Sequence, residues 1–106
     1  MHCAQLTSMK GISLFTGLRE LNLSSNSLLA MTNLNGLNRL EVLNLSCNKL
    51  NQLISLAPVA RTLRKLILSH NRIVSLQPLA SLAGDVLEHL DINDNYVGEL
   101  EQVKHL

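Results

Sequence analysis

Aliphatic residues follow one another along this chain at two alternating spacings. In residues 62–73, TLRKLILSHNRI, the aliphatic positions 63, 66 and 68 lie three and then two apart, and the asparagine at 71 follows. A spacing of two places side chains on one face of a short strand. Beyond the asparagine a spacing of three continues at 73, 76, 79 and 82, as in a 3₁₀-like segment. The pattern therefore predicts a short strand, a turn and an irregular return segment.

This pattern occurs four times. The copies are LRELNLSSNSL (18–28), LEVLNLSCNKL (40–50), LRKLILSHNRI (63–73) and LEHLDINDNYV (87–97), and they share the form LxxLxLxxNxL with isoleucine or valine at some positions. Their asparagines, Asn26, Asn48, Asn71 and Asn95, lie 22, 23 and 24 residues apart. Internal repetition at this period predicts stacked units, each of which pairs its strand in parallel with the next.

The repeated motif resembles that of leucine-rich repeat proteins. The three-residue spacing after each asparagine is similar to the short 22-residue class typified by a regulatory subunit of the type-1 protein phosphatase. The resemblance covers nearly all 106 residues. It implies an α/β solenoid, a leucine-rich repeat fold with parallel β-strands on the concave face and 3₁₀-like or irregular convex segments.

We expect one leucine-rich repeat domain over residues 1–106, with about four full repeats and a partial N-terminal one. Neither end carries the polar cap that a solenoid needs, which indicates a fragment of a longer array. An atypical end repeat that serves as its own cap is the alternative. Uncapped ends would expose apolar side chains and favour end-to-end self-association; these residues are Leu6, Met9, Leu100, Val103 and Leu106.

The repeated asparagine is expected to form a structural ladder made of Asn26, Asn48, Asn71 and Asn95. A buried amide has two donor hydrogens and an acceptor oxygen, so it can pair with backbone groups of its own and neighbouring repeats. Pro58 and Pro78 fall in the return segments, where a missing N–H group does least harm.

Charge and composition limit the partners. Nine basic and eight acidic residues leave a net charge of +1, so no overall field attracts nucleic acid or a membrane surface. No apolar run reaches the roughly 18 residues of a spanning helix, and the N-terminus lacks a signal-peptide pattern. The two cysteines, Cys3 and Cys47, are expected about 10 Å apart, too far for a disulfide, which favours a reducing, intracellular location. We expect no cofactor, no direct contact with nucleic acid and no contact with a membrane.

One column of residues has the composition of a catalytic site. Cys47, His70 and Asp94 each precede the repeated asparagine, so they should lie on consecutive rungs about 4.8 Å apart. A nucleophile, a base and an orienting carboxylate could act together, or hold a transition metal. This position is a polar turn, and no pattern supplies an oxyanion hole. We therefore expect no catalysis and no metal site.

The outward-facing strand residues carry the functional prediction. Apolar Val42 and Ile67 are expected beside basic Arg64 and Lys65, a combination that suits an acidic, amphipathic segment of a partner protein. The full predicted patch is Val42, Arg64, Lys65, Ile67, Arg72, Glu88 and Asp91. The alternative is that these charges only keep a solvated face soluble.

The resemblance implies a non-catalytic scaffold or adaptor for protein–protein interaction. Relatives of this repeat class regulate phosphatases, reside at centrosomes, basal bodies and axonemes, or join RNA-processing assemblies. We therefore expect an intracellular, cytoplasmic protein associated with the cytoskeleton, centrosome, basal body or cilium. Two other classes stay open. The first is a bacterial surface adhesin, because SLQPLASL (75–82) resembles the proline-containing turn of internalin-like repeats. The second is a structural subunit of an RNA-processing assembly, although the balanced charge weighs against direct RNA contact.

Overall fold

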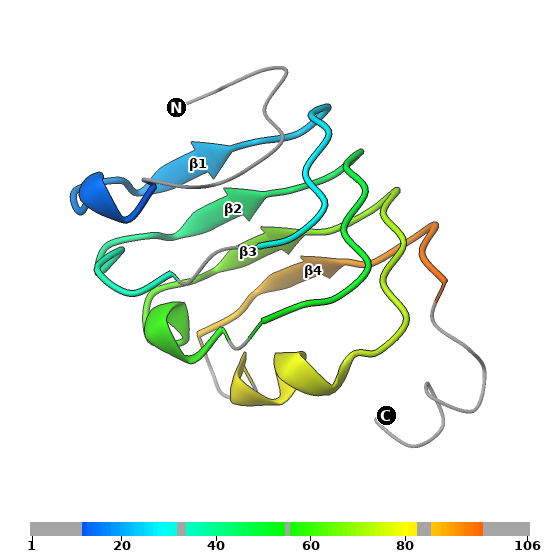
Figure 1. The fold of residues 1–106 in the computed structure, drawn as a ribbon. Helices are drawn as coiled ribbons and strands as arrows, with labels where there is room; N and C mark the ends of the chain where they lie inside the picture. Colours follow the sequence, from blue (N-terminus) through cyan, green and yellow to red (C-terminus); the bar gives the residue numbers. More distant parts are fainter. Residues whose placement is uncertain (1–11, 32–33, 55, 83–85, 97–106) are drawn as a thin grey trace.

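Four parallel strands form the frame of the molecule. The structure, a computed structural model, describes residues 12–31, 34–54, 56–82 and 86–96. Within these ranges the strands are β1 (Glu20–Asn22), β2 (Val42–Asn44), β3 (Lys65–Ile67) and β4 (His89–Asp91). They form one sheet in chain order, and every neighbouring pair is parallel. Each repeat thus adds one rung, as the aligned motifs predict (Figure 1).

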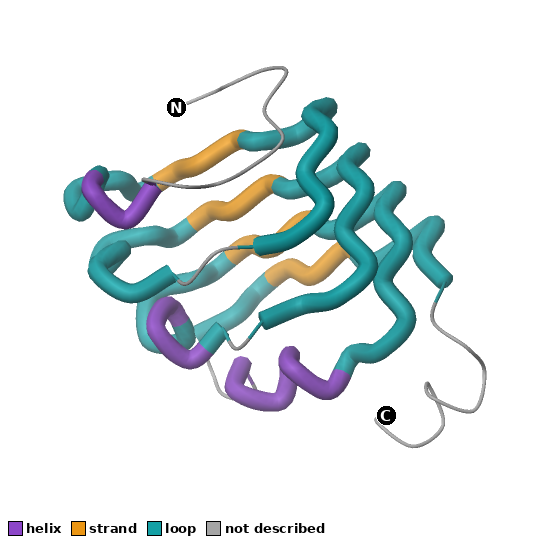
Figure 2. The backbone as a smooth tube through the Cα atoms, in the orientation of Figure 1, coloured by secondary structure: helices purple, strands orange, loops and turns teal. Residues whose placement is uncertain are grey.

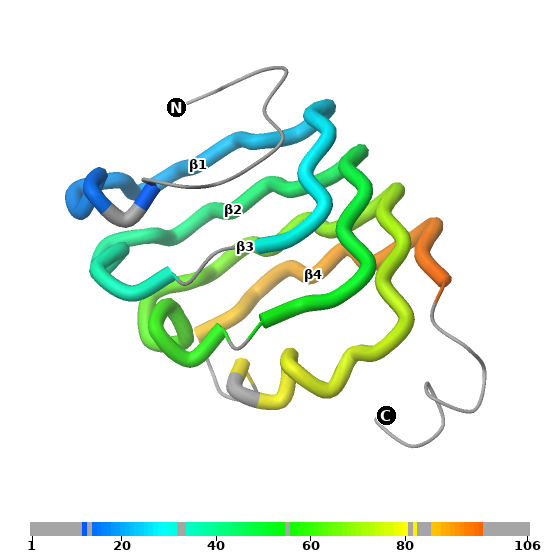
Figure 3. The backbone as a smooth tube through the Cα atoms, viewed as in Figure 1, coloured from blue at the N-terminus to red at the C-terminus, as the bar shows by residue number. Residues whose placement is uncertain are grey.

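The register joins equivalent positions of successive repeats. Leu21 of β1 lies beside Leu43 of β2, which lies beside Leu66 of β3, and Leu90 of β4 follows. Backbone pairing continues past the strands, because the Leu23 N–H donates to the Asn44 carbonyl at 2.8 Å. Figure 3 shows the successive turns of the chain stacked beside one another in sequence order.

The return segments complete each turn opposite the sheet (Figure 2). They contain the 3₁₀ helices η1 (Ile12–Leu14), η2 (Ala57–Val59) and η3 (Gln77–Leu82), whereas residues 34–39 between β1 and β2 form turns. Pro58 lies in η2 and Pro78 in η3, outside the strands as predicted. Both kinds of return segment that the sequence predicts, 3₁₀ and irregular, are therefore present. Within the described ranges, no helix is long and apolar enough to cross a membrane.

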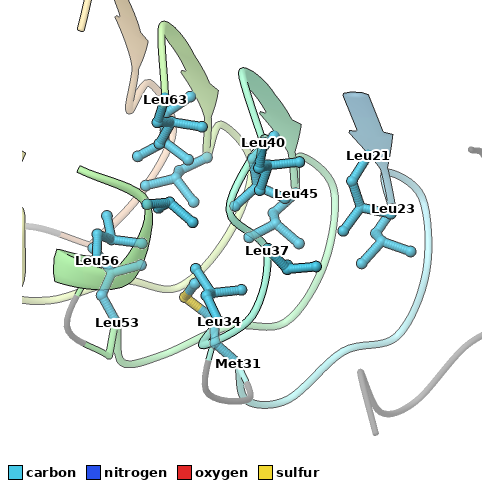
Figure 4. Close-up of a cluster of buried hydrophobic side chains, with 14 of the residues drawn as sticks. Leu21, Leu23, Met31, Leu34, Leu37, Leu40, Leu45, Leu53, Leu56 and Leu63 are labelled. Carbon is cyan, nitrogen blue, oxygen red and sulfur yellow. The ribbon is translucent and has the colours of Figure 1, made fainter. Parts of the chain in front are cut away.

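Leucine fills the space between the sheet and the return segments. Figure 4 shows Leu21, Leu23, Leu45 and their neighbours pointing from both sides into one interior. The central strand leucines Leu43 and Leu66 are fully buried, and each such side chain contributes roughly 1.5–3 kcal/mol by leaving water. Leu90 differs: it lies in β4 at the edge of the sheet and is 40% exposed. The terminal residues predicted to be exposed at both ends lie outside the described residues.

The repeated asparagines hold the turns together. The Asn71 Oδ1 atom accepts from the Leu50 N–H at 3.1 Å, while its Nδ2 group donates to the Leu45 and Leu68 carbonyls at 2.9 and 3.0 Å. Asn48 makes the equivalent bonds one repeat earlier and Asn95 one repeat later. Each of these three amides joins backbone groups of its own repeat to groups of the preceding one.

Candidate functional site

The outer sheet face consists of the strand side chains on either side of the buried central leucines. The register arranges them in two columns, which are Glu20, Val42, Lys65 and His89 in one and Asn22, Asn44, Ile67 and Asp91 in the other. Glu20, Lys65 and His89 are exposed, and the other five are half-buried. Any molecule that lies across the four strands meets these side chains first.

Val42 and Ile67 form an apolar pair on this otherwise polar face. Val42 lies beside Lys65 in the register, and Ile67 lies beside Asn44. The two aliphatic side chains are therefore diagonal neighbours on adjacent strands. They are half-buried rather than buried, so part of their apolar surface faces water.

The column that contains Ile67 is otherwise made of residues that bond to their own chain. Asn44 Oδ1 accepts from the N–H and the hydroxyl of Ser46 at 3.0 and 2.8 Å. Asn22 makes the same two bonds with Ser24, at 3.0 and 2.6 Å. These bonds fix the side-chain conformation at the surface. In β3 the position equivalent to Asn22 and Asn44 is Ile67, so one apolar side chain lies in an otherwise polar column.

A column of alternating charge precedes the strands. Arg19, Glu41, Arg64 and Glu88 each stand directly before a strand. The Glu41 and Val42 N–H groups both donate to the Arg19 carbonyl at 2.7 and 2.9 Å, and the same pairing recurs at Arg64 and Glu88. The Arg64 Nε atom lies 4.0 Å from Glu41 Oε1. This column therefore projects from a backbone that is hydrogen-bonded on every rung.

A hollow of about 620 Å³ lies over this column. We call it the arginine hollow; its charged lining residues are Arg19, Arg39, Glu41, Arg61, Arg64 and Glu88. Sequence reasoning missed Arg39 and Arg61, which come from the turns ahead of β2 and β3. The signal that could have found them is a basic residue one or two positions before the first leucine of two successive repeats, in NRL (38–40) and RTL (61–63).

The structure divides the predicted patch into separate parts. Val42, Lys65, Ile67 and Asp91 lie on the outer sheet face, while Arg64 and Glu88 line the arginine hollow. Arg72 belongs to neither: it follows the turn beyond β3, and its N–H donates to the Leu50 carbonyl at 2.7 Å. The extended chain between Arg64 and this turn spans about 20 Å. Arg72 therefore lies apart from Arg64, because β3 and the following turn separate them.

The column of Cys47, His70 and Asp94 is a turn position. His70 Nδ1 lies 3.4 Å from Asp94 Oδ2 with both side chains largely exposed, and Cys47 is an exposed free thiol. All three residues, and Ser25 in the first repeat, have φ of 57–58°, so the left-handed turn explains why they align. Within the part of the chain that the structure describes, no group of three His, Cys, Asp or Glu residues could hold a metal ion. Cys3 lies outside the described residues.

Comparison with known proteins adds two family matches. The family described as Leucine Rich repeats (2 copies) matches residues 61–105, and the family described as Leucine Rich Repeat matches residues 39–58. No curated protein matches the chain. The matched ranges contain β2, β3 and β4 with the turns that follow them. Together with the four equivalent parallel strands, these matches identify the chain as a leucine-rich repeat protein, a class whose domains are generally modules for protein–protein interaction.

Proposed function

We propose that this chain is a non-catalytic scaffold or adaptor, of the short 22-residue repeat class, that binds a partner protein on its outer sheet face. The observation that carries the proposal is the diagonal pair of Val42 and Ile67, two partly exposed aliphatic side chains with Lys65 beside them. Interfaces need a desolvated apolar centre bordered by polar groups, and this pair with its surroundings has that composition.

The backbone supports the proposal because the face is held rigid. Strands β2 and β3 have a hydrogen-bonded neighbour on both sides, and Asn22 and Asn44 are fixed by bonds to their own serines. A surface that is already ordered loses little conformational entropy when a partner binds. We therefore expect a partner to bind this face without a change in the backbone conformation of the strands.

Charge and apolar contact would contribute differently. Lys65 is exposed and is expected to speed the encounter with an acidic partner, because surface charges act mainly on the association rate. Val42 and Ile67 would slow dissociation once their apolar surface is covered. A partner with acidic and aliphatic residues on one face suits this arrangement best.

We place this function inside the cell, because Cys47 is an exposed free thiol, and such a group persists best in a reducing compartment. The exposure of Cys47 also favours a structural role in the turns for Cys47, His70 and Asp94 over a catalytic role. His70 and Asp94 also point into open solvent, with side chains 59% and 66% exposed. A general base works best where water is excluded and the geometry is fixed.

Quantitative affinity capture tests the proposal. The full chain, its Ile67→Asp variant and a Leu29→Asp variant would serve as baits, with bound proteins counted by mass spectrometry. Leu29 is a matched control, because it is exposed and aliphatic but follows the turn after β1, off the outer sheet face. We expect a protein that wild type and Leu29→Asp retain and Ile67→Asp loses. Equal retention by all three baits would contradict binding at the outer sheet face.

A further inference from the structure

The charges that line the arginine hollow do not balance. Among the described residues, four arginines and two glutamates line it, an excess of two positive charges in one place, whereas the whole chain carries only +1. Arg64 is paired with Glu41 at 4.0 Å. Among the described residues, no acidic side chain lies within that distance of Arg39 or Arg61. These two guanidinium groups are therefore available to an anionic ligand.

Arg39 and Arg61 project from turns that the fold holds in place. Ahead of β2, the Leu40 N–H donates to the Leu37 carbonyl at 3.4 Å. Ahead of β3, the Thr62 and Leu63 N–H groups both donate to the Val59 carbonyl, at 3.1 and 2.8 Å. A planar guanidinium on a fixed backbone can take a carboxylate through two parallel hydrogen bonds.

The size of the hollow suits a segment of chain. Its volume of about 620 Å³ falls within the roughly 300–1,000 Å³ of ordinary ligand sites. It lies at the amino ends of the strands, where its lining residues Glu41 and Arg64 directly precede Val42 and Lys65. A partner that covers the outer sheet face can therefore also reach the hollow.

The lining favours a peptide with carboxylate side chains over a nucleic acid. Glu41 and Glu88 interrupt the row of cations, so a nucleic-acid backbone would meet negative charge on alternate rungs, where it needs a continuous basic track. No described lining residue is aromatic, so bases would lack the stacking platforms that single strands use.

We infer that the arginine hollow docks an acidic segment of a partner protein, with two side-chain carboxylates on Arg39 and Arg61. This inference rests on the proposed function and deepens it. The acidic residues enter the hollow, and aliphatic residues next to them in the same segment cover Val42 and Ile67. The hollow thus sets which way the partner lies across the strands.

Fluorescence anisotropy with defined probes tests the inference. The probe is a fluorescein-labelled peptide in which glutamate alternates with serine, and the control peptide has glutamine in place of glutamate. We expect the glutamate peptide to bind wild type and the glutamine peptide not to bind. Arg39→Glu with Arg61→Glu should weaken binding about tenfold, roughly threefold for each exposed arginine. The neutral variants Arg39→Gln and Arg61→Gln should weaken it less, and circular dichroism verifies that each variant is folded.

Lys49→Glu is the matched control for Arg61→Glu. Lys49 is an exposed cation beyond the turn after β2 and is not part of the hollow, so its reversal changes net charge equally. Binding should weaken for Arg61→Glu and stay unchanged for Lys49→Glu. Equal loss in both variants would mean general charge attraction and would overturn the inference. Tighter binding of a phosphoserine peptide or of single-stranded RNA would overturn it as well.

The two proposals can fail separately. If the captured partner loses affinity for Ile67→Asp but not for the Arg39→Glu and Arg61→Glu double variant, the outer sheet face binds and the hollow does not. If the glutamate peptide depends on both arginines while no protein depends on Ile67, the hollow binds acidic chains and the proposed sheet interface is wrong.

Discussion

Replacing Asn71 by leucine removes a bridge from the middle of the molecule. The Asn71 amide is 4% exposed and bonds to backbone groups of two repeats. Leucine has the same number of side-chain heavy atoms and the same branching at Cγ, so the change removes the hydrogen bonds while the shape of the side chain is largely kept. The loss in free energy of unfolding can therefore be worked out from the partners that are left behind.

The backbone groups that bond to Asn71 do not all lose the same free energy when its amide is removed. The Leu50 N–H bonds only to Asn71 among the described hydrogen bonds, so it becomes a buried donor without a partner, at about 1–3 kcal/mol. The Leu45 carbonyl keeps Asn48 and the Leu68 carbonyl keeps Asn95 as donors. Each of these two lost bonds costs only about 0.5–1.5 kcal/mol. The sum is about 2–6 kcal/mol, a large share of the stability of a domain of this size.

Urea denaturation followed by far-ultraviolet circular dichroism measures this loss. Asn38→Leu is the matched control, because Asn38 is an exposed asparagine in the return segment, and its replacement should change stability by less than about 0.5 kcal/mol. Thermal melts should agree, with Asn71→Leu lower by about 10 °C or more. Equal midpoints for the two variants would refute the reasoning that buried asparagine bridges stabilise the turns.

Three further changes test other parts of the account. Leu43→Ala empties a fully buried position in β2 and should cost about 2–5 kcal/mol in urea denaturation; a loss below 1 kcal/mol would contradict a tightly packed interior. In a Cys3→Ser background, Cys47 should react with iodoacetamide at the same rate with or without His70→Ala, since a slower reaction in the variant would reveal an activating base. Leu90→Glu should reduce any concentration-dependent association seen by light scattering, because Leu90 is 40% exposed on the edge strand. If the wild-type chain is monomeric at every concentration, end-to-end pairing is contradicted.

The fold was predictable because every repeat carries the same local pattern. Aligning the asparagines also aligns the strands, and the structure pairs Leu21, Leu43, Leu66 and Leu90 in that register. Proline marked two return segments, since η2 and η3 contain Pro58 and Pro78. The 3₁₀ turns were predictable for the same reason, because apolar residues recur at every third position in the return segments.

The arginine hollow could not be found by alignment alone. Arg39 lies one residue before the first leucine of its repeat, and Arg61 lies two residues before, since the second return segment is one residue longer. Counted from the preceding asparagine, both lie 13 residues on, after Asn26 and Asn48, but only the folded turns bring them into one hollow with Arg19 and Arg64. Arg72 is the opposite case. It shares a repeat with Arg64 and Lys65, but the length of β3 and the following turn carry it away from them.

Nuclear magnetic resonance can show directly whether a partner binds at the outer sheet face. The captured partner would be added to isotopically labelled chain while the amide and methyl shifts are followed. We expect the largest changes at Val42, Lys65 and Ile67 on the outer sheet face, with changes at Arg39 and Arg61 if the hollow takes part. Changes confined to η2, η3 and the other return segments, with the strand signals unmoved, would contradict it.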